Sequence, residues 1–374
     1  MTRGRKKLIR WFILGLGILI LAIAGALGLS YYTGNLDLGL WQVSYYSVHK
    51  KANFTKNYEL YVYPEMTQEE ILDSLCRGAG MLDRKIMNHA FKEAMEEAAD
   101  EGMPYVEIKP GKYTVTKKDP SIYVARMLIH GWQTPHKLTL SGTMRNKGVI
   151  AKKIANQMMV DSASVAAVLD DKEFLEGYGF TPEEVFGMIL PDTYEMYWDA
   201  TVEEIFDRLK KEYDTFWTEE RLAKAKERKL TQKEVSVLAS IVSGETNVSS
   251  EYATIAGVYL NRLNKGMLLQ ADPTVCFCYD YTLDRVLNKH LTIDSPYNTY
   301  KYKGLPPAPI NVPPKACLDA VLSPEEHDYL YFCASADFDG SHMFAKTFNA
   351  HKKNARKFQN ALNKRNKEKA KAAK

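Results

Sequence analysis

The sequence has few cysteines and little net charge, and both shortages exclude classes of protein. Its 374 residues include five cysteines. An odd number, with Cys276 and Cys278 too close for a relaxed bridge, argues against a disulfide framework. The 50 Lys and Arg residues are nearly balanced by 46 Asp and Glu residues, for a net charge of +4. Because basic residues exceed acidic ones only at the two ends, no nucleic-acid partner is expected.

Ionisable side chains are also missing from Trp11–Leu29, which is apolar throughout. A helix of this length, at about 1.5 Å per residue, crosses most of a hydrocarbon core of about 30 Å. The segment before it carries five basic residues and no acid: Arg3, Arg5, Lys6, Lys7 and Arg10. This pattern predicts a cytoplasmic segment at 1–10, one transmembrane helix at 11–29, and an extracytoplasmic chain from about Ser30. The alternative is a cleaved signal peptide, with Ala22, Ala24 and Ala26 near its cleavage site.

The rest of the chain is longer than one core usually organises, so two domains are expected after a linker at 30–56. Over 57–171, strand-like and helix-like segments alternate, and Thr67 with Glu70 forms a capping-box signature. This α+β region has few candidate catalytic groups, so binding suits it better than chemistry. The second domain, 172–354, is predicted to contain helices over 231–246 and about 250–265. The basic tail, 355–374, is expected to fray from a helix into disorder.

One acid stands on the apolar face of the helix predicted over 231–246. The apolar residues at helical spacing are Val235, Leu238, Ile241 and Val242. Glu245 falls on the same face, at the C-terminal end. Burial and the negative end of the helix dipole both disfavour ionisation, so Glu245 can stay protonated near neutral pH and act as a general acid. The structural alternative is an ion pair between Glu245 and a buried Arg262.

Amides, hydroxyls and aromatic rings follow this acid in a pattern that suits a carbohydrate. Rings stack on the apolar faces of sugars, and amides bond their hydroxyl groups. Each residue alone fits a turn or a core equally well, but together they predict a substrate groove. The candidates are Asn261, Arg262, Gln270, Asp272 and Thr274, then Tyr297, Asn298, Thr299, Tyr300 and Tyr302 in a proline-rich stretch, and finally His342, Phe344, Thr347 and His351.

Three other chemistries use overlapping residues. A zinc site would draw on Cys276, Cys278, His342 and His351. Its C-x-C spacing is too tight for the usual knuckle, and its histidines are not four residues apart. A Ser243–His342–Asp272 triad lacks a nucleophile elbow, because Ser243 lies inside a predicted helix. A two-carboxylate glycosidase using Glu245 and Asp272 stays open as an alternative.

Several ordered segments resemble the bacterial endolytic murein transglycosylases of the MltG/YceG-like family. These are "LASIVSGET", "YATIAGVYLNRLNKGMLLQADPTV", "SPYNTYKYKGLPPAPINVPP", "YLYFCA" and "HMFAKTFNAHKKN". The resemblance is dense over 231–354 and extends more loosely to "LPDTYEMY" and to a LysM-like region upstream. It implies an α+β fold with a small LysM-like domain at 57–171 and a mixed α/β catalytic domain at 172–354.

The resemblance also implies a reaction and its residues. The catalytic acid falls on Glu245, and the D-P-T, Y-N-T-Y, G-L-P-P and H-x-F elements fall on 272–274, 297–300, 304–307 and 342–344. The implied enzyme cleaves MurNAc–GlcNAc bonds of nascent glycan strands, forms 1,6-anhydroMurNAc ends and terminates elongation. It needs no cofactor or metal. Its partners are peptidoglycan strands and, by shared membrane, peptidoglycan-synthesis enzymes.

Two departures from the family pattern stand out. Where the family commonly has E-x-E-T, this chain has Ser243-Gly244-Glu245-Thr246, so Glu245 is the only acid on that turn. Phe186-Gly187 stands where an acid commonly precedes P-D-T-Y. Two alternatives remain: a two-carboxylate peptidoglycan hydrolase, and a non-catalytic wall-binding or division scaffold.

Overall fold

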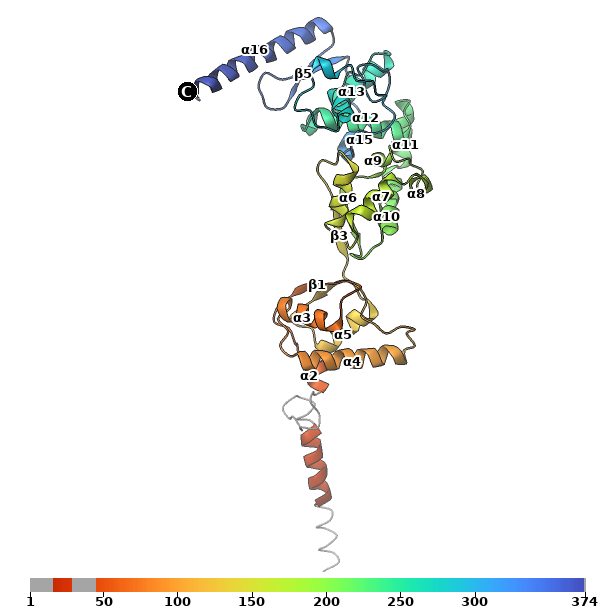
Figure 1. The fold of residues 1–374 in the computed structure, drawn as a ribbon, viewed down its shortest axis with the longest axis vertical. Helices are drawn as coiled ribbons and strands as arrows, with labels where there is room; N and C mark the ends of the chain where they lie inside the picture. The colour runs from red at the N-terminus through yellow and green to blue at the C-terminus, as the bar shows by residue number, and fades with distance from the viewer. Residues whose placement is uncertain (1–15, 29–44, 373–374) are drawn as a thin grey trace, which may run out of the picture. The chain divides into compact units, whose positions relative to one another are not determined.

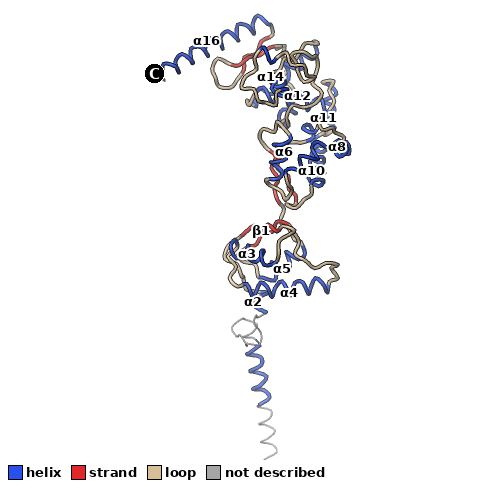
Figure 2. The backbone as a smooth tube through the Cα atoms, viewed as in Figure 1, coloured by secondary structure: helices blue, strands red, loops and turns tan. Residues whose placement is uncertain are grey.

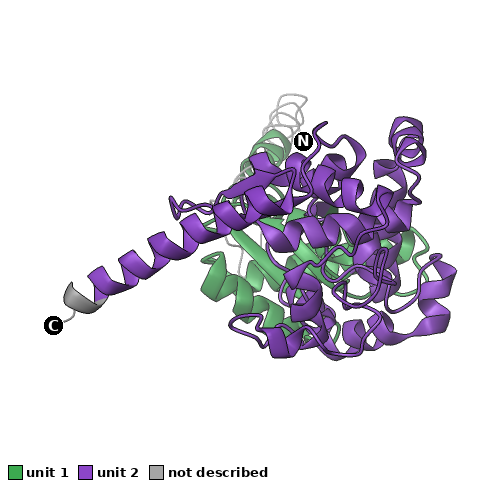
Figure 3. Cartoon of the chain, turned by 90° about the horizontal axis from the view of Figure 1, so that it is seen from above, with its two compact units in different colours: residues 1–136, 195–199 green, residues 137–194, 200–374 purple. Residues whose placement is uncertain are grey.

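The computed structural model describes residues 16–28 and 45–372, which fall into two compact units. Unit 1 comprises the chain up to His136 together with Glu195–Asp199, and unit 2 comprises Lys137–Tyr194 and everything from Ala200 onward (Figure 3). Helices predominate, with three small two-stranded sheets (Figure 2). This mixture confirms the predicted α+β class.

The predicted transmembrane segment is only partly described. Residues 16–28 are helical, and their side chains are exposed. The predicted cytoplasmic segment, residues 11–15 and 29 of the span, and the linker up to residue 44 lie outside the described residues. Within the described part of the chain, no helix is both long and apolar enough to cross a membrane.

Unit 1 is built on a strand–helix–helix–strand arrangement (Figure 1). Its elements are α2 (Tyr45–His49), β1 (Tyr58–Val62), α3 (Gln68–Gly78), α4 (Arg84–Asp100), β2 (Gly111–Val115) and α5 (Ser121–His130). β1 and β2 pair antiparallel, with Leu60 opposite Tyr113, and both of these side chains are fully buried. The predicted capping box starts α3, since Thr67 N–H donates to Glu70 Oε2 (2.8 Å) and Glu70 N–H to Thr67 Oγ1 (3.3 Å).

Unit 2 contains the remaining elements, except that the last two residues of β4 belong to unit 1. They are β3 (His136–Leu140, which starts at the unit boundary), α6 (Lys147–Ala155), α7 (Ser162–Asp170), α8 (Lys172–Gly177), α9 (Val185–Met188), β4 (Asp192–Met196), α10 (Val202–Phe216), α11 (Glu219–Glu227), α12 (Gln232–Glu245), η1 (Ser249–Glu251), α13 (Tyr252–Asn264), α14 (Asp272–Cys278), η2 (Asn288–His290), α15 (Lys315–Leu322), β5 (Tyr331–Ala334), β6 (His342–Ala345) and α16 (Phe348–Ala372). β3 pairs with β4, and β5 pairs antiparallel with β6.

The helix that carries the candidate acid, α12, lies in the middle of the core of unit 2. It packs against α13, α14 and α15, and every side chain from Val235 to Val242 is buried, so its apolar surface is wider than one stripe. Its C-terminal end approaches α14 closely: a Cβ on Gly244 would lie 2.6 Å from Pro273 Cβ. Glycine at 244 therefore lets Glu245 lie beside the start of α14.

The chain divides earlier than the expected domain boundary at 171/172. Residues 137–171 belong to unit 2, where Met144 O accepts a hydrogen bond from Val312 N (3.0 Å). The alternation of strands and helices in the sequence continues across this division and does not mark it. The basic tail also differs from expectation, because α16 stays helical to Ala372. Its Ala-, Lys- and Arg-rich composition favours a helix.

Candidate active site

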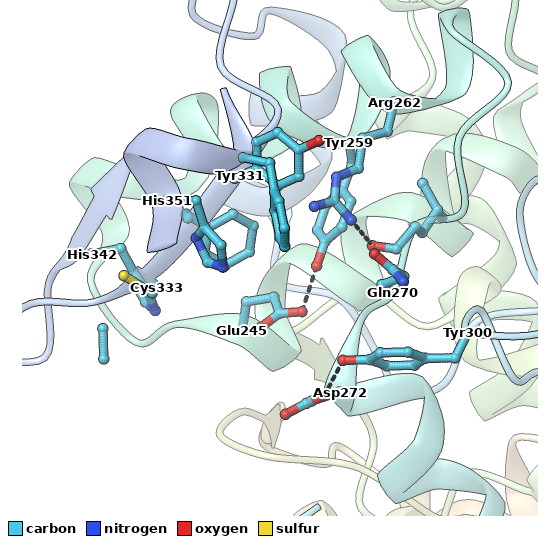
Figure 4. A pocket seen from close by; sticks show the side chains of 14 residues that line it. Glu245, Tyr259, Arg262, Gln270, Asp272, Tyr300, Tyr331, Cys333, His342 and His351 are labelled. Atoms are coloured by element: carbon cyan, nitrogen blue, oxygen red, sulfur yellow. Dashed lines mark hydrogen bonds between the residues drawn. The ribbon is translucent and has the colours of Figure 1, made fainter. Parts of the chain in front are cut away.

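A cavity of about 370 Å³ opens in unit 2 beside the C-terminal end of α12 (Figure 4). Its walls come from α12, α13, the start of α14, the proline-rich loop, the β5–β6 hairpin and the start of α16. The lining residues are Glu245, Tyr259, Arg262, Leu269, Gln270, Asp272, Tyr300, Tyr331, Phe332, Cys333, Ala334, His342, Phe348 and His351. Seven of them were candidates from the sequence: Glu245, Arg262, Gln270, Asp272, Tyr300, His342 and His351.

Glu245 is the acid of this cavity. Its Oε1 accepts a hydrogen bond from the Tyr259 hydroxyl. The pKa of Glu245 is raised to about 7, chiefly by burial; the Tyr259 hydrogen bond and Arg262 oppose the rise, and the nearby Asp272 contributes to it. A carboxyl with such a pKa is substantially protonated at neutral pH, so it can donate a proton and later accept one.

Arg262 is buried but does not pair with Glu245. Its Nε donates to Leu330 O (2.6 Å), and its Nη1 donates to Leu269 O (2.7 Å) and Leu268 O (3.3 Å). Among the described residues Arg262 and Glu245 form no direct ion pair, although the charge of Arg262 lowers the pKa of Glu245. The guanidinium therefore ties the start of β5 to the loop before α14, and its direct hydrogen-bond partners are backbone carbonyls rather than Glu245.

The second carboxylate of the cavity, Asp272, begins α14 and is exposed. Its Oδ1 accepts a hydrogen bond from the Tyr300 hydroxyl (2.6 Å). Beside it, Gln270 has a φ of +50°, a left-handed conformation that costs a non-glycine residue about 1 kcal/mol or more. This strained residue faces the cavity, where its amide can meet a ligand.

His342 is held by an acid that the sequence did not reveal. The backbone N–H of His342 donates to Glu251 Oε1 (2.7 Å). The ring Nδ1 of His342 lies 2.7 Å from Glu251 Oε2. Both side chains are mostly buried, at 13% and 12% exposure. A carboxylate at Nδ1 favours the proton there, which leaves Nε2 for other partners. Glu251 lies in η1, six residues after Glu245, so one short segment supplies both acids.

His351 completes the wall at the start of α16. Its ring stacks on Tyr331 at 5.6 Å, and the Arg262 guanidinium lies over the same Tyr331 ring at 5.3 Å. Burial lowers the pKa of His351, and Arg262 adds to the effect. The shift favours the neutral imidazole, whose buried Nδ1 has no partner among the described residues.

Four amide and hydroxyl candidates serve the loops around the cavity and do not line it. Asn261 Nδ2 donates to His327 O (2.8 Å), and Asn298 Nδ2 donates to Ile293 O (2.8 Å). Thr299 Oγ1 accepts from Ala271 N (3.0 Å) and lies 2.8 Å from Thr274 Oγ1. The Thr299 bonds hold the loop that carries Gln270 and Asp272.

The other candidates outside the lining are aromatic or lie at element ends. Tyr297 packs on Phe277, and Phe344 stacks near Tyr329. Tyr302 bonds Asp294 (2.6 Å), and Thr347 Oγ1 accepts from Ala350 N (3.2 Å) at the start of α16. An aromatic or a short polar residue in a sequence does not show whether it faces a ligand or its own chain.

Lining residues that the sequence did not single out include Tyr259, Tyr331, Phe332, Cys333 and Phe348. Tyr259 carried a usable signal. It is a tyrosine within an apolar helical run, and a buried tyrosine hydroxyl needs a partner. The residues of β5 alternate in a short strand whose partner strand is not evident from sequence, so their facing could not be predicted.

The two minor chemistries find no support in the geometry. Within residues 16–28 and 45–372, no group of three or more His, Cys, Asp or Glu side chains is placed to hold a metal ion. Ser243 Oγ lies 2.9 Å from Asn311 Oδ1 and 3.0 Å from Ser240 O, so it bonds its own core and not His342.

A family model and two curated relatives are similar to this chain, and their names agree with one another. The model of the YceG-like family matches residues 60–357. An endolytic murein transglycosylase of Bacillus subtilis (strain 168) is 34% identical over 229 residues, which cover 57% of this chain and 63% of that protein. An endolytic murein transglycosylase of Streptococcus pneumoniae serotype 2 is 29% identical over 173 residues, covering 45% and 31%. The chain thus spans less than two thirds of the length of these curated relatives.

A solved structure is similar as well. The crystal structure of a putative YceG-like protein from Listeria monocytogenes has a TM-score of 0.52 with this chain at 26% identity. The similarity covers 80% of this chain and 98% of the other.

Proposed function

We propose, from the premise that this chain belongs to the YceG-like family, that it is a lytic transglycosylase that cleaves peptidoglycan glycan strands internally. The observation that carries the proposal is Glu245: an acid with a pKa of about 7 in a cavity lined by aromatic and polar side chains. Such a group can serve as acid and then as base in one turnover. The names of the two relatives support the same activity.

The chemistry needs only this one group. Glu245 donates its proton to the glycosidic oxygen between MurNAc and GlcNAc, and the bond from that oxygen to C1 breaks, leaving its electron pair on the oxygen. The C6 hydroxyl of the same MurNAc attacks C1 to close a 1,6-anhydro ring. The Glu245 carboxylate takes the proton of that hydroxyl and returns to its acid form. Because the nucleophile is intramolecular, its effective molarity is high and no water is required.

The product separates this reaction from its alternatives. We expect the full-length protein to release anhydromuropeptides from purified peptidoglycan, detected by mass spectrometry. Reducing MurNAc ends would indicate the two-carboxylate hydrolase with Glu245 and Asp272. Binding with no released product would indicate the wall-binding scaffold. Either result would remove the proposed function.

We further propose a single membrane anchor with the N-terminus in the cytoplasm. Support comes from the uncharged segment Trp11–Leu29 behind a basic head, and from apolar side chains exposed on residues 16–28, such as Leu21 at 73%. A reporter fused after Lys374 should be active only outside the cytoplasm; activity inside the cytoplasm would count against the proposal. Anchoring would also place the chain beside peptidoglycan-synthesis enzymes, its proposed partners, which cross-linking in membranes can test.

We propose that residues 57–136, the part of the expected 57–171 region that lies in unit 1, form a LysM-like module that binds the wall. Its order β1–α3–α4–β2, with the two strands antiparallel, suits a small binding module. Trp132 and Tyr123 are about half exposed and lie near one another, at 6.2 Å between ring centroids. Such rings can stack on sugars. Trp132→Ala should weaken sedimentation with peptidoglycan, whereas Leu82→Ala, at another exposed apolar site, should not.

A further inference from the structure

The hydroxyl of Tyr259 is the group in closest association with the candidate acid. Tyr259 lies in α13 and is 1% exposed. Its ring meets Phe332 of β5 edge-on, with 5.9 Å between the centroids and an interplanar angle of 85°. The buried ring directs its hydroxyl to Glu245 across the α12–α13 interface (Figure 4).

The two oxygens of Glu245 are therefore not equivalent. Oε1 accepts the Tyr259 hydrogen bond. Oε2 has no hydrogen-bond partner among the described residues, and the side chain lines the cavity. Rotation of the carboxyl about its last bond would break the bond to Tyr259, so Oε2 is kept available to a ligand.

The Tyr259 hydroxyl can play this part in both charge states of the acid. Burial and the adjacent Glu245 hold the pKa of Tyr259 well above its ordinary value, so the hydroxyl stays protonated. A hydrogen bond to a charged carboxylate is stronger than one to a neutral carboxyl. Tyr259 thus stabilises the carboxylate that exists after the first proton transfer more than the acid that precedes it.

Other titratable groups also face the cavity, and several have partners of their own. Asp272 is bonded to Tyr300, Arg262 to backbone carbonyls and His342 to Glu251. The remaining titratable groups in the lining are Tyr300, Tyr331, Cys333 and His351. No side chain in this set other than that of Tyr259 bonds Glu245.

We propose that Tyr259 is a positioning residue: its hydroxyl fixes Oε1 of Glu245, makes Oε2 the oxygen that exchanges the proton with the glycan, and stabilises the carboxylate between the two proton transfers. This inference rests on the proposed transglycosylase function. The inference goes beyond that function because it assigns both proton transfers to Oε2 of Glu245 and gives a role to Tyr259, which does not touch the reacting atoms.

Tyr259→Phe tests the proposal with the pH profile of anhydro-product formation by the full-length protein. Without the donor, the Glu245 carboxylate is less stable and its pKa rises. Because the first step needs the acid form, the alkaline limb of kcat/KM should move to higher pH by about one unit. We expect kcat to fall about 10-fold or more, since the carboxyl loses its fixed orientation. The product should still carry anhydro ends.

Tyr194→Phe is the matched control. Tyr194 is also 1% exposed, and its hydroxyl donates to Leu190 O, away from Glu245. The Tyr194→Phe variant should lose about as much stability as Tyr259→Phe, while the pH profile of its activity stays unchanged. An unmoved alkaline limb in Tyr259→Phe, whether or not kcat falls, would overturn the proposal and leave Tyr259 a purely structural residue.

Two further measurements keep the result interpretable. If Tyr259→Phe is too unstable for kinetics, the pH dependence of its free energy of unfolding still reports the pKa of Glu245 in the folded protein. We expect this pKa to be higher than in the parent protein, and an unchanged pKa would overturn the proposal. Glu245→Gln is assayed in parallel. An inert Glu245→Gln with an unshifted Tyr259→Phe removes this inference alone, whereas an active Glu245→Gln removes the proposed function itself.

Discussion

Replacing Glu245 by Gln separates a catalytic role from a structural one, because the two roles predict opposite changes in stability. The amide is nearly isosteric, and its oxygen can still accept the Tyr259 hydrogen bond. The variant lacks the transferable proton, so activity should fall by about 10²- to 10⁴-fold, the usual contribution of a positioned acid–base group.

The stability change follows from the raised pKa of Glu245. When a carboxyl holds its proton more tightly in the folded state, the free energy of unfolding of the protein decreases as pH rises from the unfolded to the folded pKa of that group. Here these are 4.5 and about 7, and one pKa unit corresponds to about 1.36 kcal/mol. The charged Glu245 should therefore destabilise the fold by on the order of 3 kcal/mol above pH 7, and Glu245→Gln should be spared this cost.

If Glu245 instead served as the ion-pair partner of Arg262, Glu245→Gln would lower the stability of the protein. A stranded Arg262 would destabilise Glu245→Gln by roughly 3–5 kcal/mol at the same pH. Urea unfolding at pH 5 and pH 8, combined with quantification of anhydromuropeptides, measures both quantities. Glu234→Gln is the control, because Glu234 caps the other end of α12 and Gln can also complete a capping box. A folded Glu245→Gln protein with undiminished cleavage, or one destabilised at pH 8, would refute the reasoning.

Two other substitutions address the cavity. Asp272→Asn should still form anhydro ends, and its alkaline limb should move to lower pH, because the Asp272 charge raises the pKa of Glu245; abolished cleavage would instead favour a two-carboxylate hydrolase. Glu251→Gln should release the His342 imidazole and raise KM about 10-fold with a smaller change in kcat, since both its carboxylate oxygens bond His342. An unchanged KM would argue against a substrate-binding role for His342.

Much of the fold around the acid could be predicted because its signals are local. The apolar spacing predicted the helix that ends at Glu245 to within one residue at each end, and the structure adds a capping box of Thr231 and Glu234 at its start. Hydrogen bonds between residues three apart, and burial repeated every three or four residues, depend on short stretches of chain. The seven candidates that line the cavity also follow closely in sequence or belong to ordered motifs of the family.

By itself, then, the sequence determined the α+β class, the helix that bears Glu245, and the segments from which the cavity is built. Only the tertiary structure decided what each polar side chain faces. It turned Arg262 to backbone carbonyls, paired Glu251 with His342 across 91 positions, and brought the Tyr259 hydroxyl to Glu245. The reason is that a buried polar group takes whichever partner packing brings within about 3 Å, and that distance depends on the contacts of the whole unit rather than on any local pattern.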